Sequence, residues 1–473
     1  MTSLIRKVWV SVITRSGSSS ASPHMSNPNP LSDHDRFLQM MYIQTSSTGE
    51  FDRIPIDIFM QILKILGPRE SARVRAVCKA WKFLVSDNRL WIYFLQNQPE
   101  PWDSVFFAET HLRSGYPLQV FPSQMHDLSF MHIYGQREEV PGALIIDGGS
   151  GYCKYGWSKY SSPSGRNLET SSLQCLLDLD ILFNNLQQDA GENINTANCC
   201  IIPLCHYDNT ESAKSSRRQL KDAIYSTLFD MNVPAVCAIN QATLALFAAR
   251  RTSGVVVNVG FHQTSVVPIL HGKVMHKVGV ETVGMGALKL TGFLRDRMQQ
   301  NNIHFDSLYT VRTLKENLCY VALDYEAELS KDTQASFAVT SNNWFTLSKE
   351  RFQTGEILFQ PRMAGMQAMG LHQAVALCMD HCHDAELTGD DNWYKTVVLT
   401  GGTACLPGLA ARLEKELYGL LPLSISSGIR VFPPPYGTDS AWYGAKLVSN
   451  VISAVVDKSI VYVGIIFVRP AKK

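Results

Sequence analysis

A glycine-rich turn flanked by an acid and a base is the part of this sequence best suited to chemistry. Asp147 opens the turn Asp-Gly-Gly-Ser-Gly, and Lys154 follows it. Three glycines in five residues expose successive backbone N–H groups, and such a nest suits an anion such as phosphate. Asp147 can orient a metal ion through water, and Lys154 adds a positive charge. The candidate phosphate contacts are Gly148, Gly149, Ser150, Gly151 and Lys154.

The elements around this turn occur twice in the chain. Residues 143–146 are apolar and residues 152–157 follow the turn, so two antiparallel strands are predicted. Residues 254–270 repeat the plan, with Asn258 in the position of the acid and Gly260 in that of the second glycine. A short glycine motif alone is often an ordinary hairpin. Two such units indicate a duplicated domain with a nucleotide between its halves.

Both hairpins resemble those of the actin family. IIDGGSGYCKYG (145–156) is similar to the family's first phosphate hairpin, and VVVNVGFHQTSVVPI (255–269) is similar to its second. The resemblance extends over residues 141–450 and implies fold class α/β, a duplicated actin-like (ribonuclease H-like) two-lobed ATPase fold that closes over ATP or ADP. The segment 158–196 is much shorter than the outer lobe that the family has at this place. We therefore expect a reduced outer lobe and no actin-like filament.

Further segments resemble the parts of the family that surround the nucleotide. Gln241 falls where the family holds the glutamine that positions the attacking water; a glutamine at a helix start is the alternative. TLKENLCYVALDYEAE (313–328) resembles the helix whose Lys-Glu pair borders the adenosine, although such a pair is otherwise usually a solvated face. The resemblance implies Gln241 and Asp147 as catalytic residues. The nucleotide contacts that it implies beyond the first turn are Asn258, Gly260, Lys315, Glu316, Gly401, Gly402 and Thr403.

The second hairpin departs from the family at the positions that carry charge. Asn258 and Phe261 stand in place of two acids, and His262 stands in place of a glycine. Such carboxylates hold metal-bound waters and promote hydrolysis, whereas an amide carries no charge. Thr438 replaces the basic residue that flanks adenine. We expect Mg²⁺ to bind weakly or not at all, with only Asp147 as a metal residue through water, and at most a weak ATPase activity.

The segment Phe51–Gln96 has the pattern of a small helical unit. Pro55 and Asp57 predict a helix start, and apolar residues follow at helical spacing. Gly67-Pro68 predicts a break in the helix. Units of about 40 residues rarely bury enough apolar surface to be stable alone. The apolar excess indicates docking onto another protein; a helical hairpin packed on the following domain is the alternative.

This unit also resembles the F-box. The matching stretches are IPIDIFMQIL (54–63), VRAVCKAWKFL (74–84) and LW (90–91). The resemblance implies binding to a Skp1-type adaptor of a cullin-based ubiquitin ligase, with Trp81 in the core. The contacts that it implies are Ile54, Pro55, Ile58 and Ile62.

Composition restricts the class of protein. The 473 residues are 45% hydrophobic, and 43 basic residues nearly balance 42 acidic ones, so no direct nucleic-acid binding is expected. The eleven cysteines have no C-x-x-C spacing, and we expect reduced thiols. Apolar runs fall short of the roughly 20 residues that cross a bilayer, so no membrane partner is expected.

The chain is thus expected to contain five segments. A disordered leader (1–50) precedes the F-box (51–96), a packed aromatic linker (97–140), the actin-like domain (141–450) and a tail without an assigned role (451–473). A targeting segment at Leu4–Arg15 is the alternative for the leader. Translation from Met25 would remove residues 1–24.

The F-box ahead of an actin-like domain resembles the F-box-containing actin-related proteins of plants. This implies an adaptor that joins an unknown protein substrate to the ligase and binds ATP with little hydrolysis. The alternatives are a structural subunit of a nuclear or chromatin complex, and a weak ATPase that acts as a switch. The expected location is the nucleus, the nucleolus included, on the basic stretch Lys214–Lys221, with the cytoplasm as the alternative.

Overall fold

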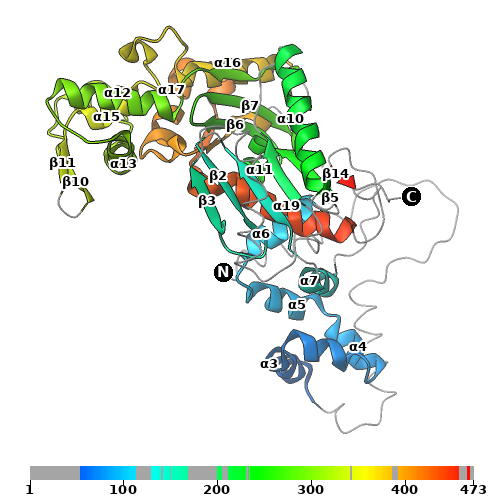
Figure 1. The fold of residues 1–473 in the computed structure, drawn as a ribbon. Coiled ribbons are helices and arrows are strands. Elements are labelled where there is room, and N and C mark those ends of the chain that lie inside the picture. Colours follow the sequence, from blue (N-terminus) through cyan, green and yellow to red (C-terminus); the bar gives the residue numbers. More distant parts are fainter. Residues whose placement is uncertain are drawn as a thin grey trace. The chain divides into compact units, whose positions relative to one another are not determined.

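The chain forms two compact units that meet between Leu90 and Trp91. The computed structural model is shown in Figure 1, and each unit is described by itself. The division falls inside the expected F-box segment, and the expected leader lies outside the described residues. The structure describes residues 54–112, 129–139, 142–149, 151–168, 200–204, 211–230, 233, 235–340, 343–385, 392–456 and 466–468.

The first unit is helical. Gly67 has a φ of 82°, and it breaks the first helix where the Gly-Pro pair predicts a break. Phe59 and Leu63 are buried, and the ring of Phe59 lies 4.9 Å from that of Trp81. Trp81 therefore packs inside the unit. The helices are α3 (Ile56–Val74), α4 (Lys79–Val85) and the start of α5 (Asn88–Gln96).

The linker that follows is built from short helices whose aromatic rings pack against one another at tilted angles. Trp91 lies 5.4 Å from Tyr134, and Trp102 lies 5.6 Å from Phe130. Arg137 forms ion pairs with two acids, one just before α6 (Trp102–Phe107) and one in the π-helical turn, at 2.6 and 3.1 Å. Tyr116 and Phe121 lie outside the described residues. The elements are α6 (Trp102–Phe107), a π-helical turn (Ala108–Leu112) and α7 (Phe130–Glu139), and the acids are Glu100 and Glu109.

The first lobe of the second unit is built on a six-stranded mixed sheet with the order β14-β5-β4-β1-β2-β3. β1 pairs antiparallel with β2 and parallel with β4. The buried strand β1 is apolar up to Asp147, which lies opposite Lys154. The strands are β1 (Leu144–Gly148), β2 (Tyr152–Trp157), β3 (Gly165–Leu168), β4 (Cys200–Leu204), β5 (Ala235–Asn240) and β14 (Ile466–Val468), with helices α10 (Glu211–Asp230) and α11 (Gln241–Ala248).

The second lobe repeats this plan around the path β13-β12-β6-β7-β8, with β9 also paired to β7. β6 pairs antiparallel with β7 and parallel with β12, and Asn258 lies opposite Ser265. The strands are β6 (Gly254–Val259), β7 (Thr264–Leu270), β8 (Lys273–Val274), β9 (Glu281–Val283), β12 (Thr396–Thr400) and β13 (Arg430–Phe432). The α/β class and the duplicated, two-lobed plan are therefore confirmed, while the expected outer-lobe region lies mostly outside the described residues.

Helices and a hairpin cover the second lobe and bury its main core. That core includes Leu294, Leu314, Val375 and Leu413, one from each of the longer helices. These elements are α12 (Ala287–Gln300), α13 (Leu308–Leu318), α14 (Tyr325–Leu329), β10 (Ala335–Thr340), β11 (Asn343–Leu347), α15 (Glu350–Glu356), α16 (Leu371–Asp384), α17 (Leu409–Leu420) and α18 (Leu423–Ser426).

Two helices cross where the lobes join. α11 follows β5, and α19 (Ser440–Val456) follows β13, so they are equivalent elements of the two halves. A side chain at Gly444 of α19 would meet the backbone of Leu244 on α11. The helices can approach this closely only because Gly444 has no Cβ atom. The linker packs on the same place, since Phe107 and Leu112 share a core cluster with Phe247 and Trp442.

The chain end and the cysteines differ from what the sequence predicts. The chain end supplies β14, whose residues 466–468 pair antiparallel with β5 as the edge strand of the first sheet. Cys153 is disulfide-bonded, so the expectation of reduced thiols throughout is wrong there. Sequence spacing does not show which cysteines meet in a sheet. The cysteines described as free are Cys78, Cys237, Cys319, Cys378, Cys382 and Cys405.

Among the helices that the structure describes, we find none with the length and apolar character that crossing a membrane requires.

Candidate functional site

The turns of the two glycine-containing hairpins adjoin each other. A side chain at Gly151 would place its Cβ 3.3 Å from Cδ2 of Phe261. On the other side, Gly401 has a φ of 93°, and a side chain there would meet Asn258. Sequence segments far apart thus converge on one place. We call it the interlobe site: the turns 148–151 and 260–263, the loop 401–403 and the pair Thr438–Asp439. Ser150 lies outside the described residues.

A chain of polar side chains links the two hairpins. Gln241, the first residue of α11, donates its amide to Oδ1 of Asp147 at 2.9 Å. Its carbonyl accepts from Nδ2 of Asn258 at 3.4 Å. Asp147 is buried, and this burial raises the pKa of its carboxyl above the ordinary value. Gln241 therefore bridges the acid of the first hairpin and the amide of the second.

Lys154 is held by groups that belong to the interlobe site. Its ammonium lies 3.4 Å from Oδ1 of Asp439 and 3.8 Å from Oδ2 of Asp147, and it donates to the carbonyl of Thr438. Arg166 of β3 pairs with the other oxygen of Asp439. The first hairpin is thereby attached to the segment that leads into α19.

The backbone of both turns is partly satisfied within the protein. The N–H of Gly149 donates to the carbonyl of Tyr152 at 3.2 Å. In the second turn the N–H of Gly260 donates to the carbonyl of Gln263 at 3.0 Å. The carbonyl of Gly260 also accepts from Ala287, the first residue of α12, at 2.9 Å. These bonds fix the turn geometry and engage two of the N–H groups that the sequence assigned to an anion.

Lys315 and Glu316 point in different directions. Lys315 is buried and donates to Oγ1 of Thr291 at 3.1 Å, so it ties α13 to α12. This burial lowers the pKa of the Lys315 ammonium. Glu316 is exposed and forms an ion pair with Arg312 at 2.9 Å. Arg312 lies 4.4 Å above the ring of Tyr152 and thus joins the second lobe to the first hairpin.

The loop 401–403 lies at the open end of the site. Gly402 is exposed, and a side chain there would meet only Cγ2 of Thr438, at 3.8 Å. Thr403 is buried and begins a short 3₁₀ turn that ends at Cys405. Burial raises the pKa of the Cys405 thiol, and the charge of Glu316 also acts on it. Room beside Gly402 therefore remains where the resemblance implies the adenosine.

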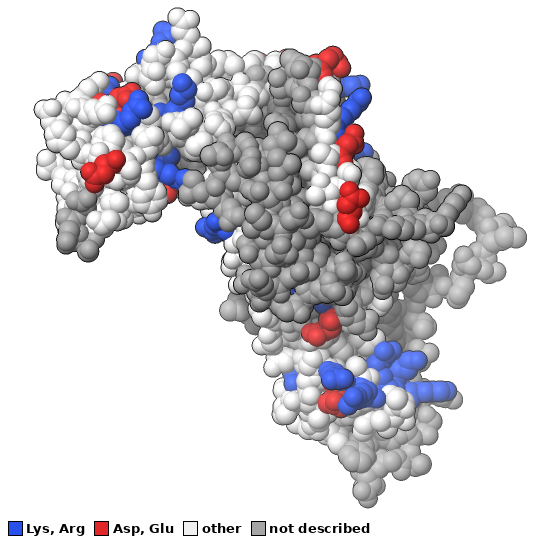
Figure 2. Space-filling model, viewed as in Figure 1, with Lys and Arg blue, Asp and Glu red and all other residues white. Residues whose placement is uncertain are grey.

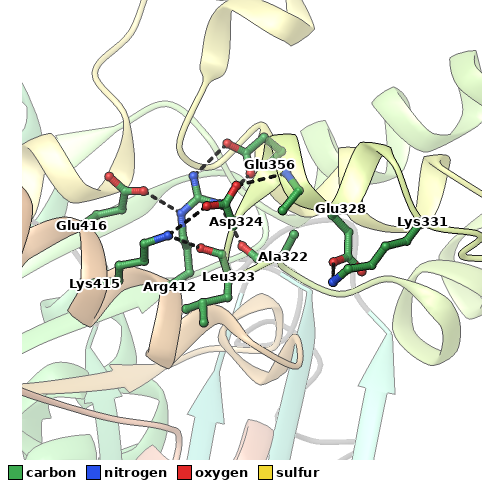
Figure 3. A network of polar contacts seen from close by, with 10 residues as sticks. Ala322, Leu323, Asp324, Glu328, Lys331, Glu356, Arg412, Lys415 and Glu416 are labelled. Carbon is green, nitrogen blue, oxygen red and sulfur yellow. Dashed lines mark hydrogen bonds and ion pairs between the residues drawn. The ribbon is translucent and has the colours of Figure 1, made fainter.

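A buried ion pair sets the position of this loop relative to α13. Arg412 of α17 forms ion pairs with Glu356 at 3.1 Å and with Glu416 at 2.6 Å, and Figure 3 shows it between these two acids. Arg412 also donates to the carbonyl of Ala322, in the segment that follows α13. Nearby, the N–H of Val321 donates to the carbonyl of Pro407 at 2.8 Å. Arg412 is not predicted from the sequence as a buried residue. The position of a basic residue on an amphipathic helix does not tell whether its side chain points into the protein or toward solvent.

The metal-binding capacity of the site is small. Both carboxylate oxygens of Asp147 already face protein groups, the amide of Gln241 and the ammonium of Lys154. Within the part of the chain that the structure describes, no three His, Cys, Asp or Glu residues are grouped to hold a metal ion. Since Mg²⁺ requires oxygen ligands, the described residues do not fit a directly bound magnesium.

A second candidate site is the apolar stripe on α3. Ile58 is 50% exposed and Ile62, one turn later, is 38% exposed. Pro55 is exposed and Ile54 half-buried at the start of the helix. Ile65, at 85%, is the most exposed of the stripe, and the sequence reasoning did not name it as a contact. Ile65 follows Ile58 and Ile62 at helical spacing, so the same period places it on the stripe.

Comparison with known proteins gives two family matches and several close relatives. A family model described as Actin matches residues 209–313 and 304–453, and one described as F-box-like matches residues 51–97. Actin-related protein 8 of Arabidopsis thaliana is 61% identical over 459 residues, which are 94% of this chain and 95% of the relative. Actin-related protein 8 of Oryza sativa, in both subspecies indica and japonica, is 56% identical over 466 residues, covering 95% and 94%.

Proposed function

Because this chain belongs to the actin family and carries an F-box-like segment ahead of the actin-like body, we propose that it is an adaptor of a cullin ubiquitin ligase. The F-box binds a Skp1-type subunit, and the actin-like body receives a protein substrate. The observation that carries this proposal is the exposed apolar stripe of α3, because a soluble unit of this size gains nothing from leaving four large aliphatic side chains in water. The stripe consists of Ile58, Ile62, Ile65 and Leu66.

The charge of the helical unit favours an acidic partner. Residues 54–90 contain seven Lys and Arg against three Asp and Glu, whereas the whole chain is almost neutral. Figure 2 shows Lys and Arg side chains gathered on the lower part of the view, where Figure 1 labels α3 and α4. An apolar stripe with a basic surround is complementary to an apolar groove with an acidic rim.

A pull-down of the full chain with purified Skp1-type adaptor tests this function. The variants Ile58→Asp and Ile62→Asp should weaken binding by about tenfold or more, because each places a charge in an apolar contact. Leu423→Asp is the matched control, since Leu423 of α18 is an equally apolar side chain that is 80% exposed on the second unit. Equal adaptor binding by all of these proteins would refute the proposal.

The actin-like body is proposed to bind an adenosine nucleotide and hydrolyse it slowly. Support comes from the adjoining glycine turns and from the room beside Gly402. Slow hydrolysis is expected because Gln241 is bonded at both ends of its amide, to Asp147 and Asn258, and no second carboxylate faces it in the second turn. The nucleotide would serve as a structural ligand.

A structural role in a nuclear complex is the second candidate, favoured by the name actin-related protein that the relatives from Arabidopsis thaliana and Oryza sativa share. Affinity purification from plant nuclei, with and without residues 51–96, separates the two functions. Recovery of cullin subunits only with the full chain supports the adaptor. Recovery of the same nuclear complex by both proteins supports the structural subunit, and a nuclear location itself is a proposal that imaging of a tagged chain tests.

A further inference from the structure

The side chain of Phe261 lies between the two hairpin turns of the interlobe site. Its Cβ and Cγ would each lie 3.5 Å from a Cβ placed on Gly151, which is ordinary van der Waals contact. The aligned position of the first hairpin is Ser150, since Asn258 aligns with Asp147. In the sequence, an aromatic residue of the second hairpin thus stands where the first hairpin has a serine.

The backbone that carries this ring is firmly held. The carbonyl of Phe261 accepts the N–H of Leu288, in the first turn of α12, at 2.9 Å. A side chain at Gly286 would meet the backbone of residues 261–263, so the loop before α12 lies directly against this turn. The ring of His262 packs edge-on to that of Phe261, with centroids 4.8 Å apart. Phe261 therefore cannot leave the space between the turns by a shift of its backbone alone.

This arrangement restricts what the site can hold. A phosphate pressed against an aromatic ring loses water and gains no donor, which is costly for a charged group. A metal ion at the same place finds an aromatic ring and the amide of Asn258 on the second hairpin, where it needs oxygen ligands with charge. By contrast, the end of the site near Gly402 remains open.

We propose that Phe261 makes the interlobe site selective for nucleotides with a short phosphate chain, bound without metal, and against the magnesium complex of a nucleoside triphosphate. This inference rests on the nucleotide-binding part of the proposed function and is independent of the adaptor part. Lys154, which the first hairpin brings to the site, supplies positive charge near the phosphates in place of the metal, and it shares this charge with Asp439 and Asp147.

Fluorescence anisotropy of the full chain with N-methylanthraniloyl ADP and ATP, each in excess Mg²⁺ or in EDTA, measures this selectivity. We expect ADP to bind about tenfold or more tightly than ATP, with the ADP affinity the same within about twofold in Mg²⁺ and EDTA. Equal affinity for the two nucleotides, or a strong requirement for Mg²⁺, overturns the proposal.

Variants of the ring assign the selectivity to Phe261. Phe261→Ala should bring ATP binding within about threefold of ADP binding, and Phe261→Asp should make binding depend on Mg²⁺. Phe432→Ala, at a half-exposed ring on β13, is the matched control and should behave as wild type. Unchanged selectivity in a Phe261→Ala protein that melts like wild type overturns the assignment. If that variant does not fold, the wild-type comparison of ADP with ATP still decides.

Gly402→Val locates the binding. An added Cβ there meets only Cγ2 of Thr438, at an ordinary contact distance of 3.8 Å, so the fold should be retained while both nucleotides bind about tenfold or more weakly. Absence of binding by wild type overturns this inference together with the nucleotide proposal. The adaptor pull-down needs no nucleotide, so its result is read separately.

Discussion

At the scale of single residues, the polar side chains of the interlobe site bond to one another. The buried carboxylate of Asp147 faces the amide of Gln241 and the ammonium of Lys154, and Gln241 faces a neutral amide at Asn258. Each of these groups already has a partner inside the protein. Their arrangement stabilises the contact between the two hairpins.

The titration of Asp147 provides a test of its burial. Because burial raises its pKa above the ordinary 3.8, the folded protein binds this proton more tightly than the unfolded chain does. The free energy of unfolding should therefore fall as pH rises from about 3.8 through the raised pKa. Asp147→Asn removes this titration, so the variant should gain stability relative to wild type across that range.

Urea unfolding of both proteins at a series of pH values measures the difference. Asp324→Asn is the control, because the pKa of the exposed Asp324 is shifted downward by a backbone hydrogen bond and by Lys415, which gives a pH dependence of the opposite sign. A difference between Asp147→Asn and wild type that stays constant with pH would show that Asp147 is not held in a buried environment.

At the scale of elements, the crossing of α11 and α19 depends on one glycine. A Cβ at Gly444 would strike the backbone of Leu244, so Gly444→Ala should lower the free energy of unfolding by about 1–3 kcal/mol. Gly292 of α12 is the matched control, since no atom lies within 4 Å of its added Cβ. Gly292→Ala should raise stability by about 0.5–1 kcal/mol through helix propensity.

Urea or thermal unfolding followed by tryptophan fluorescence checks the sign of both changes, because Trp442 lies buried at the crossing. Stabilisation by Gly444→Ala would mean that the two helices do not approach each other as described.

The elements that the sequence predicted are those with a strong local signal. The hairpins around Asp147 and Asn258 follow from apolar strands and glycine turns, and the break at Gly67 follows from a Gly-Pro pair. Their duplication predicted the two lobes and the meeting of the turns. Local pattern was sufficient there because the residue types within each strand and turn favour that element.

Other features depend on contacts that no local pattern shows. The short run 466–468 had no role assigned from the sequence. Its pairing with β5 depends on which edge strand of the folded sheet would otherwise be unpaired. The inward direction of Lys315 depends on Thr291 of another helix, and the disulfide of Cys153 depends on a contact that cysteine spacing does not show. The sequence indicates the loss of an acid at Phe261, while the closeness of its ring to Gly151 depends on how the two hairpins meet in the fold.

At the scale of the whole molecule, the linker helices belong to the actin-like body. Phe107, Ala108 and Leu112 complete the core cluster that contains Phe247 and Trp442. The chain divides at Leu90, ahead of these residues. A protein that begins at the start of α5 should therefore keep the body intact, whereas one that begins at Gly142 exposes the apolar faces of α11 and α19.

Two truncations test this boundary. The chain that starts at Asn88 should melt within about 2 °C of the full chain, and the chain that starts at Gly142 should melt about 5 °C or more lower, or aggregate, because several large side chains lose their burial. Scanning calorimetry of the three proteins measures the transitions. Identical melting of both truncated chains would place the linker outside the body.

The crossing of α11 and α19 has a mechanical consequence. α11 starts with Gln241 beside Asp147, and it reaches Phe247, whose ring lies 6.5 Å from that of Phe107. A helix of this length covers about 12 Å, so a rigid rod connects the two ends. The polar contact of Gln241 with Asp147 and the aromatic contact of Phe247 with the linker ring Phe107 therefore lie at the two ends of one short helix, so a substitution that tilts α11 should disturb both contacts together.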